Sequence, residues 1–200
     1  MKLLHVLLMI CASVFASVAS AQSYRVTVDT SELAGTGGYV NFQFNPADLG
    51  APAAEASILQ WLGSTTLLDA PLIEGNVTGS LPGTVSLNNG TAFNDYFHAA
   101  QFGDAFSFVV DFSNNVSPSV LGTSFALALY AADGVTPLLS NDISGSVVRF
   151  ELRSAGIDFV TNSSAVQVTP VPLPAAAWLL LSGVAALTGA ARSRRRAVAA

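Results

Sequence analysis

Hydrophobic and polar residues alternate through most of the middle of the chain. Val26 and Val28, for example, are separated by the polar Thr27. A period of two places every second side chain on one face of a β-strand. Runs of this kind occupy residues 24–29, 40–45, 106–112, 125–129 and 148–153. We therefore expect each of these segments to be a strand with one buried face.

Short clusters of turn-forming residues separate these runs. They are 35–38, 81–83, 88–90, 114–115, 132–134 and 141–142, rich in Gly, Asn, Asp and Pro. Many short alternating strands between such turns are typical of antiparallel all-β folds, so we predict a β-sandwich or jelly roll. The segment 53–62 suits a short helix or a strand, and its neighbours favour a strand.

The first 21 residues have the pattern of a secretory signal peptide. Lys2 precedes an apolar stretch from Leu3 to Val18, and small residues stand at Ala19 and Ala21, the positions that signal peptidase requires. We predict cleavage before Gln22. The single cysteine, Cys11, lies within this segment after the bulky Ile10, which disfavours a lipoprotein signal. The mature chain is then free of cysteine, so disulfides and thiol chemistry are not expected.

The last thirty residues have the pattern of a membrane helix. The 17 residues 175–191 carry no charge, and at 1.5 Å per residue they span about 26 Å, so that residues 171–174 are needed to approach the hydrocarbon thickness of about 30 Å. Trp178 lies near the predicted outer interface. Four arginines follow the run and indicate its cytoplasmic end: Arg192, Arg194, Arg195 and Arg196. A permanent membrane anchor and a buried core helix are the alternatives.

A specific order of residues opens this tail. It begins Val171, Pro172, Leu173, Pro174, Ala175, continues into an apolar run with Trp178 and Gly183, and ends in the arginine cluster. This order resembles the PEP-CTERM sorting signal in its VPLPA variant, over about thirty residues; the more common motif has Glu at the position of Leu173. The resemblance implies recognition by an exosortase in the inner membrane of a Gram-negative bacterium. It also implies cleavage near the proline motif and delivery to the cell surface or extracellular matrix.

Charge is distributed unevenly along the chain. It contains 8 basic and 13 acidic residues, but Lys2 and the four tail arginines lie in the predicted targeting segments. The exported body keeps three arginines against 13 acids, a net charge of −10. Such a field repels nucleic acid and anionic lipid, so we expect neither as a partner of the body.

The domain organisation follows from these segments. We predict a signal peptide at 1–21, one exported sandwich at 22–161, a linker at 162–170 and the sorting signal at 171–200. The body is long enough to bury a core of its own. The linker is expected to hold the sorting motif away from the folded domain.

Catalytic patterns are scarce in the mature chain. His98 is its single histidine, with no Gly-x-Ser-x-Gly motif, which disfavours both a serine hydrolase and a zinc site. Carboxylates are plentiful, but their spacing singles out no pair of the kind a glycosidase needs. They include Asp95, Asp104, Asp111, Asp133, Asp142, Glu151 and Asp158. We predict no enzymatic activity, no catalytic residue and no cofactor, and a glycosidase remains an alternative.

Two kinds of binding stay open. Calcium suits oxygen ligands in loops, where Asn94 with Asp95, or Asp133, are the candidates, although no EF-hand spacing is present. Trp61, Tyr96 and Tyr130 are candidates for a sugar-stacking surface, unless they belong to the core or its rim.

The sequence as a whole predicts an exported, non-enzymatic protein of the cell surface or an exopolysaccharide matrix. Its expected partners are signal peptidase and an exosortase during export, the membrane through the C-terminal helix before processing, and possible extracellular polysaccharide. A glycan-binding jelly roll and a permanently anchored surface protein are the alternatives.

Overall fold

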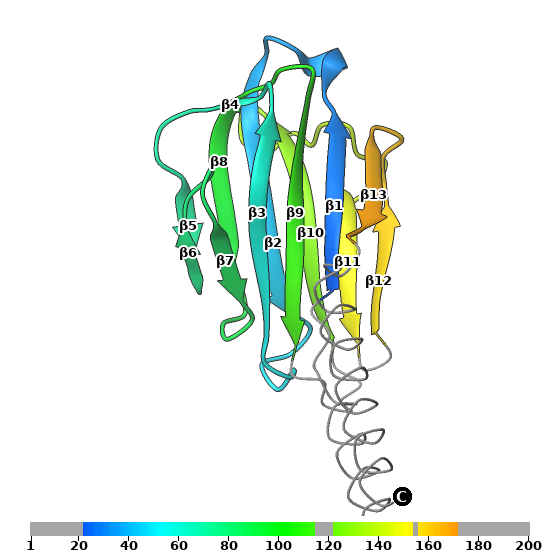
Figure 1. Cartoon of the computed structure of the whole chain (residues 1–200). Helices are drawn as coiled ribbons and strands as arrows, with labels where there is room; N and C mark the ends of the chain where they lie inside the picture. Colours follow the sequence, from blue (N-terminus) through cyan, green and yellow to red (C-terminus); the bar gives the residue numbers. More distant parts are fainter. Residues whose placement is uncertain (1–21, 115–121, 154–155, 172–200) are drawn as a thin grey trace, which may run out of the picture. The chain divides into compact units, whose positions relative to one another are not determined.

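The computed structural model describes residues 22–114, 122–153 and 156–171 (Figure 1). One compact unit extends to Pro170, and the chain from Val171 onward forms a second unit. The predicted signal peptide, including Ala19 and Ala21, lies outside the described residues. So do the membrane segment and the sorting signal after Val171. Among the residues described, no helix has the length and apolar character needed to cross a membrane.

The described chain is all-β and forms two antiparallel sheets packed face to face (Figure 1). Sheet A contains, in spatial order, β13 (Val166–Pro170), β1 (Gln22–Asp29), β9 (Ala105–Asn114), β3 (Ala54–Gly63), β7 (Val85–Asn88) and β6 (Val77–Gly79). Sheet B contains β12 (Gly156–Thr161), β11 (Ser146–Arg153), β10 (Thr123–Ala131), β2 (Gly37–Pro46), β8 (Asp95–Gln101) and β4 (Thr66–Leu67), with β5 (Leu72–Glu74) also paired to β8. A short 3-10 turn, η2 (Ser31–Leu33), follows β1. The predicted β-sandwich is confirmed, as are the predicted strands.

Aromatic side chains join the two sheets. Phe42 of β2 meets Phe108 of β9 edge to face, with ring centroids 5.1 Å apart and planes at 81°. Phe112 of β9 similarly meets Phe125 of β10 at 5.6 Å. Such contacts add to the hydrophobic stabilisation that burial of large rings provides. The alternating apolar residues of the sequence therefore form one core between the sheets.

A β-bulge sets the orientation of Trp61. The pairing of β3 with β9 shifts register between Leu59 and Leu62, and Gln60 within the shift has φ 53°. An extra residue in one strand reverses the alternation beyond it. Ile58 and Trp61 therefore both point into the core, although an odd number of positions separates them.

The predicted linker at 162–170 is wrong. Residues 166–170 form β13, which pairs with β1 from Val28↔Val166 to Tyr24↔Pro170. Val166 is buried and Val168 packs against the core, so this segment has the period of two of a strand, but over too few residues to stand out. The sandwich thus extends to Pro170 rather than ending at residue 161.

Candidate functional site

The predicted sorting motif begins where the sandwich ends. Val171 is the only residue of the motif within the described part of the chain; it directly follows β13 and is 36% exposed. Pro172, Leu173, Pro174, Ala175 and the arginines at 192 and 194–196 lie outside the described residues. The motif remains a prediction from sequence.

Two of the three candidate sugar-stacking residues belong to the core. Trp61 is 9% exposed, and its ring stacks on Phe106 at 4.6 Å with planes at 22°. Tyr96 is fully buried. Only Tyr130 of the three lies partly exposed on the surface. The interpretation of Trp61 and Tyr96 as core residues is therefore confirmed, because the bulge and the inner position on β8 turn both side chains inward.

His98 is held in a buried polar chain. Its Nε2 lies 3.1 Å from the Asp69 carbonyl oxygen and its Nδ1 lies 2.7 Å from the Tyr96 hydroxyl. A carbonyl only accepts hydrogen bonds, so in the neutral ring Nε2 carries the proton and Nδ1 accepts from Tyr96. The Tyr96 oxygen in turn accepts from the backbone N–H of Leu81 at 2.9 Å. Both ring nitrogens thus have hydrogen-bond partners within the fold.

Two of the three candidate calcium ligands, Asn94 and Asp133, have other partners. Asn94 donates through Nδ2 to the carbonyl oxygens of Phe44 at 2.9 Å and Thr91 at 2.8 Å, and its Oδ1 accepts from the N–H of Asn76 at 2.8 Å. Asp133 accepts from the N–H and hydroxyl of Thr136, which lowers the pKa of its carboxyl. Across the described ranges, no three His, Cys, Asp or Glu side chains gather closely enough to share a metal ion.

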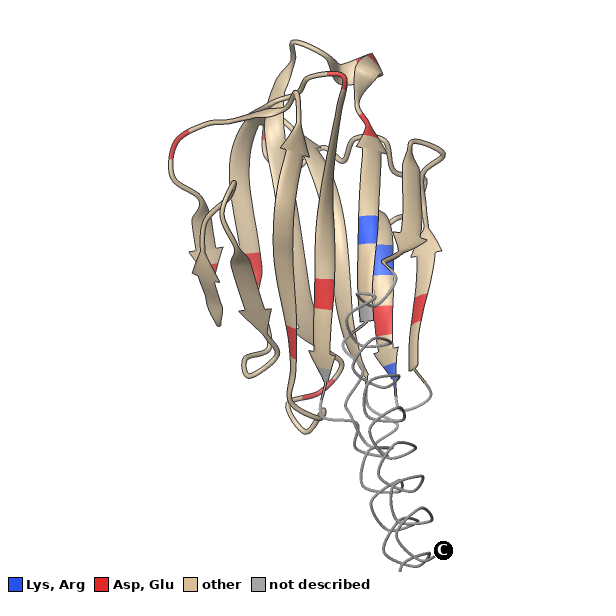
Figure 2. Ribbon diagram, in the orientation of Figure 1, with Lys and Arg blue, Asp and Glu red and all other residues tan. Residues whose placement is uncertain are grey.

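The carboxylates are spread over both sheets and the loops (Figure 2). Asp111 on β9 accepts from the Ser23 hydroxyl at 2.6 Å, and Glu151 on β11 lies 3.1 Å from Arg149. Asp95 lies directly across from Glu74 of β5, and Glu151 likewise lies directly across from Asp158 of β12. The remaining candidates occupy turns or bends, at Asp104, Asp133 and Asp142. A glycosidase needs two carboxyls flanking one bond, and the acids that lie across from each other here are Asp95 with Glu74 and Glu151 with Asp158.

Burial and charge perturb Asp95. Burial raises the pKa of its carboxyl above the usual value, and the negative charge of Glu74 raises it further, whereas a hydrogen bond with Asn45 lowers it. One carboxyl oxygen, Oδ1, is inaccessible to water and has no hydrogen-bond partner within the described chain. Asp95 is thus a carboxylate whose charge is poorly compensated.

Three aromatic rings gather beside Asp95 on the outer face of sheet B. Tyr39 of β2 stacks on Phe97 of β8 at 4.4 Å with planes at 21°, and Phe97 lies 5.8 Å from Tyr130 of β10. All three are partly exposed and alternate with inward-facing residues of the same strands. Burial raises the pKa of the Tyr130 hydroxyl, and the charge of Asp95 raises it further. The charge on Asp95 therefore acts on a hydroxyl group of this ring cluster.

Small and polar side chains lie between the rings in the strand register. Asn41 of β2 has Ala128 of β10 on one side and Phe97 on the other. It is 2% exposed although it lies on the outer face. Its Nδ2 donates to the Tyr96 carbonyl oxygen at 3.4 Å, while its Oδ1 has no partner in the part of the chain that the structure describes. Ala128 is too small to cover an amide, so we attribute this burial to Phe97 and the other rings of the cluster.

The next positions in the register extend this surface. Leu72 of β5 pairs with Phe97 and is 69% exposed, and Glu74 pairs with Asp95. We use the term aromatic face for the set Tyr39, Asn41, Leu72, Glu74, Asp95, Phe97 and Tyr130. Gly134 borders it, since a Cβ there would lie 3.7 Å from the rings of both Phe97 and Tyr39.

Sequence reasoning missed Tyr39 and Phe97. Phe97 stands between Tyr96 and His98. Because all three side chains are rings, the sequence of β8 shows no alternation between inward-facing and outward-facing residues. The one available signal was Tyr39, which has the same parity as the polar Asn41 and Gln43 in the predicted strand. That parity places Tyr39 on the outer face.

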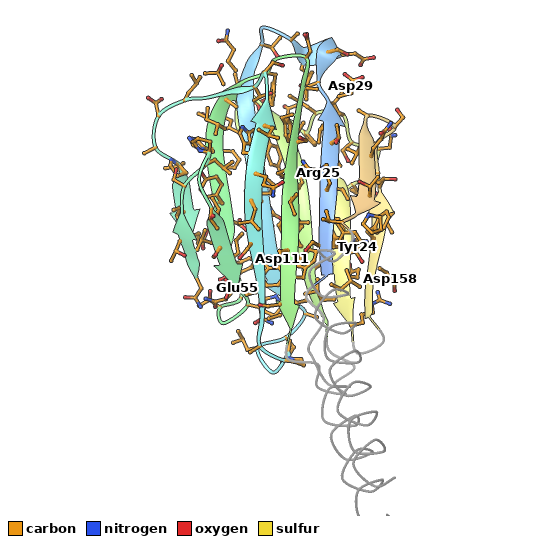
Figure 3. All side chains as sticks on the ribbon, viewed as in Figure 1. Tyr24, Arg25, Asp29, Glu55, Asp111 and Asp158 are labelled. Atoms are coloured by element: carbon orange, nitrogen blue, oxygen red, sulfur yellow. The ribbon has the colours of Figure 1, made fainter. Side chains whose placement is uncertain are left out.

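The outer face of sheet A is different in character (Figure 3). Arg25 donates from Nη2 to Gln60 Oε1 at 2.7 Å, and Ser57 and Ser86 share a hydrogen bond at 3.2 Å. With the bond from Ser23 to Asp111, these polar side chains satisfy one another. The unpartnered buried oxygens of Asn41 and Asp95 belong to the opposite face.

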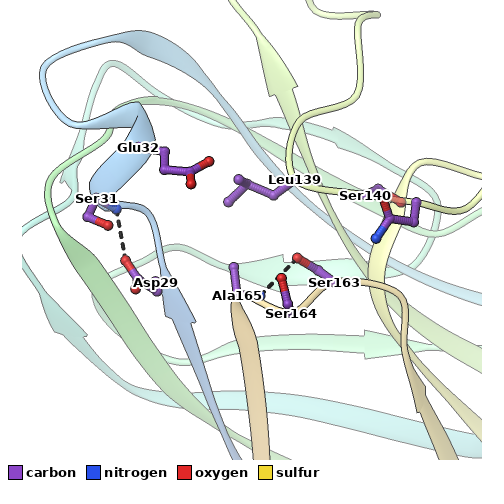
Figure 4. Close-up of a pocket in the computed structure, with 9 residues that line it drawn as sticks. Asp29, Ser31, Glu32, Leu139, Ser140, Ser163, Ser164 and Ala165 are labelled. Carbon is purple, nitrogen blue, oxygen red and sulfur yellow. Dashed lines mark hydrogen bonds between the residues drawn. The ribbon is translucent and has the colours of Figure 1, made fainter.

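An open hollow of about 370 Å³ lies near the end of β1 (Figure 4). Asp29 and Glu32 line it together with Ser163 and Ser164. Asp29 Oδ1 accepts from the N–H of Ser31 at 3.0 Å, and Ser163 Oγ accepts from the N–H of Ala165 at 3.2 Å. These side chains therefore cap the local backbone, and the hollow is a weaker candidate for binding than the aromatic face.

Comparisons with known proteins found no match among protein-family models, curated proteins or solved structures.

Proposed function

We propose that this protein is an exported, non-catalytic component of the cell surface or of an exopolysaccharide matrix. An N-terminal signal peptide directs it out of the cytoplasm, and a C-terminal PEP-CTERM-like sorting signal presents it to an exosortase. The proposal rests on the targeting patterns of the sequence. The main alternative within the same class is a surface protein that keeps its C-terminal helix as a permanent anchor.

The placement of the sandwich between the two targeting patterns carries the proposal. Its first strand begins at Gln22, the residue that follows the predicted signal-peptidase site, and its last strand ends at Pro170, directly before the predicted motif. These two strands pair with each other, and the described core draws on residues from Tyr24 to Val168. Cleavage on either side would therefore spare every strand of the sandwich.

The absence of catalysis in the proposal is supported by how the candidate groups are used. Both ring nitrogens of His98 have structural partners. Several carboxylates accept hydrogen bonds from nearby backbone or hydroxyl groups. A surface or matrix component needs no reactive centre, only a stable soluble body, and a net charge of −10 favours solubility.

Mass spectrometry of the exported protein tests this function. We expect a mature N-terminus at Gln22 and a C-terminus near Pro174, with the C-terminal cleavage lost in a strain without the exosortase. Replacing Pro172 and Pro174 together by Ala should also retain the protein in the membrane fraction. The matched control replaces Pro137, an exposed proline of the sandwich, and should leave processing unchanged.

Two results would argue against the proposal. An intact tail in the membrane fraction of every strain would support the permanent anchor instead. Unprocessed protein in the cytoplasm would contradict export. A further variant distinguishes a failure of membrane orientation from a failure of cleavage. It replaces by Ala the four arginines of the tail, Arg192, Arg194, Arg195 and Arg196. Arg153→Ala is the control.

A further inference from the structure

We propose that the aromatic face binds an amino-sugar polymer, with its pyranose rings on Tyr39, Phe97 and Tyr130 and its ammonium groups beside Glu74 and Asp95. This inference assigns a ligand to the outside of sheet B. It goes beyond the proposed export and does not depend on it, because binding requires only the folded sandwich.

The rings supply the first argument. Three partly exposed aromatic side chains come from three adjacent strands of one sheet, and stacking of Tyr39 on Phe97 fixes the orientation of that pair. Binding sites for small organic groups combine apolar and aromatic surface with a few placed polar groups. The C–H faces of a pyranose are flat and apolar, whereas its rim carries hydroxyls. A sugar ring therefore matches aromatic faces bordered by acceptors.

The unpartnered oxygens indicate which polar groups the ligand brings. Asn41 is almost completely buried, and its Oδ1 lacks a donor within the described chain. Asp95 Oδ1 is in the same situation two positions further along the register. Both atoms are acceptors, so the groups that this part of the face lacks are hydrogen-bond donors. Hydroxyl and ammonium groups donate; a carboxylated or sulfated sugar would add acceptors instead.

Charge selects the amine. Glu74 and Asp95 pair directly across β5 and β8, and Glu74 is exposed. Among the described residues, the single ion pair joins Arg149 to Glu151, so neither Glu74 nor Asp95 has a cationic partner there. The net charge of the body is also strongly negative. A cation placed at this pair gains Coulomb energy from both carboxylates, and a neighbouring aromatic face attracts it as well.

A cationic peptide is the competing ligand, and the shape of the surface disfavours it. Lysine side chains offer charge on a flexible stem, with a loss of side-chain entropy on binding. A glucosamine ring offers the same charge on a rigid flat body, which can lie against an aromatic ring without that loss of side-chain entropy. The test below includes both.

Calorimetry on the full chain tests the proposal. The protein is purified in a zwitterionic detergent without a sugar headgroup and titrated with glucosamine hexamer, N-acetylglucosamine hexamer and lysine hexamer. We expect glucosamine hexamer to bind at least about tenfold more tightly than either of the other two, because acetylation removes the charge and lysine lacks the ring.

Variants locate the site. Glu74→Gln should weaken glucosamine binding about fivefold, and Phe97→Ala about tenfold. The matched controls are Glu32→Gln, in an exposed turn, and Phe159→Ala, a 40% exposed ring on β12 at the far edge of sheet B. Both controls should bind normally. Near-ultraviolet circular dichroism verifies the fold of each variant, and Glu74→Gln, which alters only an exposed group, is the decisive one.

Several outcomes would overturn the proposal. Equal binding of acetylated and unacetylated hexamers would show that the carboxylates do not recognise the amine. Equal or tighter binding of lysine hexamer would show that the aromatic face binds cationic peptides. Unchanged affinity of Glu74→Gln places any binding elsewhere. No detectable binding of glucosamine hexamer at millimolar concentration also rejects it. None of these results affects the export proposal, which depends on processing at the two ends of the chain.

Discussion

The two faces of sheet B carry similar aromatic residues in different surroundings. On the inner face, Phe42, Tyr96 and Phe125 are fully buried, and Phe42 meets Phe108 of sheet A. On the outer face of the same three strands, Tyr39, Phe97 and Tyr130 are only partly covered. The inner hydroxyl of Tyr96 has partners, whereas outer oxygens of Asn41 and Asp95 lack them. The inner rings thus form part of the core, whereas the outer rings form a layer that is only partly covered.

The largest expected difference between the faces is in stability. Phe42→Ala should lower the free energy of unfolding by about 3–5 kcal/mol, because it leaves a cavity between the sheets. Phe97→Ala should cost clearly less, because its ring is already partly in water. Urea unfolding followed by tryptophan fluorescence measures both. Equal losses would show that the outer rings belong to the core as firmly as the inner ones.

A smaller effect concerns the hydroxyl groups. Tyr96→Phe should cost about 1–3 kcal/mol, because it leaves the N–H of Leu81 and Nδ1 of His98 without their partner in a buried region. Tyr39→Phe is the matched control on the outer face and should change the unfolding free energy little. Thermal unfolding of the two variants gives the comparison; a similar shift in both would contradict it.

The smallest expected effect depends on pH. The raised pKa of Asp95 means that the folded state favours its protonated form, so its contribution to stability is full below the usual aspartate value of 3.8 and is lost as pH rises through the folded value. Glu74 and Tyr130 are the titratable groups that face it. Asp95→Asn should therefore unfold at a higher temperature than wild type near pH 7, with the difference shrinking in acid.

Asp133 provides the opposite case. Hydrogen bonds from Thr136 lower the pKa of its carboxyl, so its stabilising contribution is present above 3.8 and disappears as pH falls through the lowered value. Asp133→Asn should reduce the melting temperature near pH 7. Melting curves of both variants between pH 3 and pH 8 would contradict this account if the two substitutions shifted the temperature in the same direction.

The strand pattern was predictable because period-two alternation follows directly from strand geometry. Tyr24, Val26 and Val28 face the core as their spacing indicates. Trp61 was not predictable to the same degree, since its orientation depends on a bulge created by pairing with β9. β13 was missed because five residues carry too little periodicity, and its stability comes from β1, far away in the sequence.

The aromatic face depends on how β2 is aligned with β8 and β10. This alignment cannot be deduced from any one stretch of the sequence. Tyr39, Phe97 and Tyr130 meet because β2 lies between β8 and β10. A one-residue slip in either pairing would turn a ring to the other side of the sheet. The unpaired oxygens of Asn41 and Asp95 likewise result from packing, so no sequence motif could predict them.

The pairing of β1 with β13 also governs how the sandwich is completed during folding. Tyr24 and Pro170 pair although almost the whole domain separates them in sequence. Contacts of such long range slow folding, because the entropy of closing the loop is lost before the contact forms. Until β13 docks, one edge of β1 remains open to other strands. A chain truncated before Val166 should therefore aggregate during refolding, even with every other strand present.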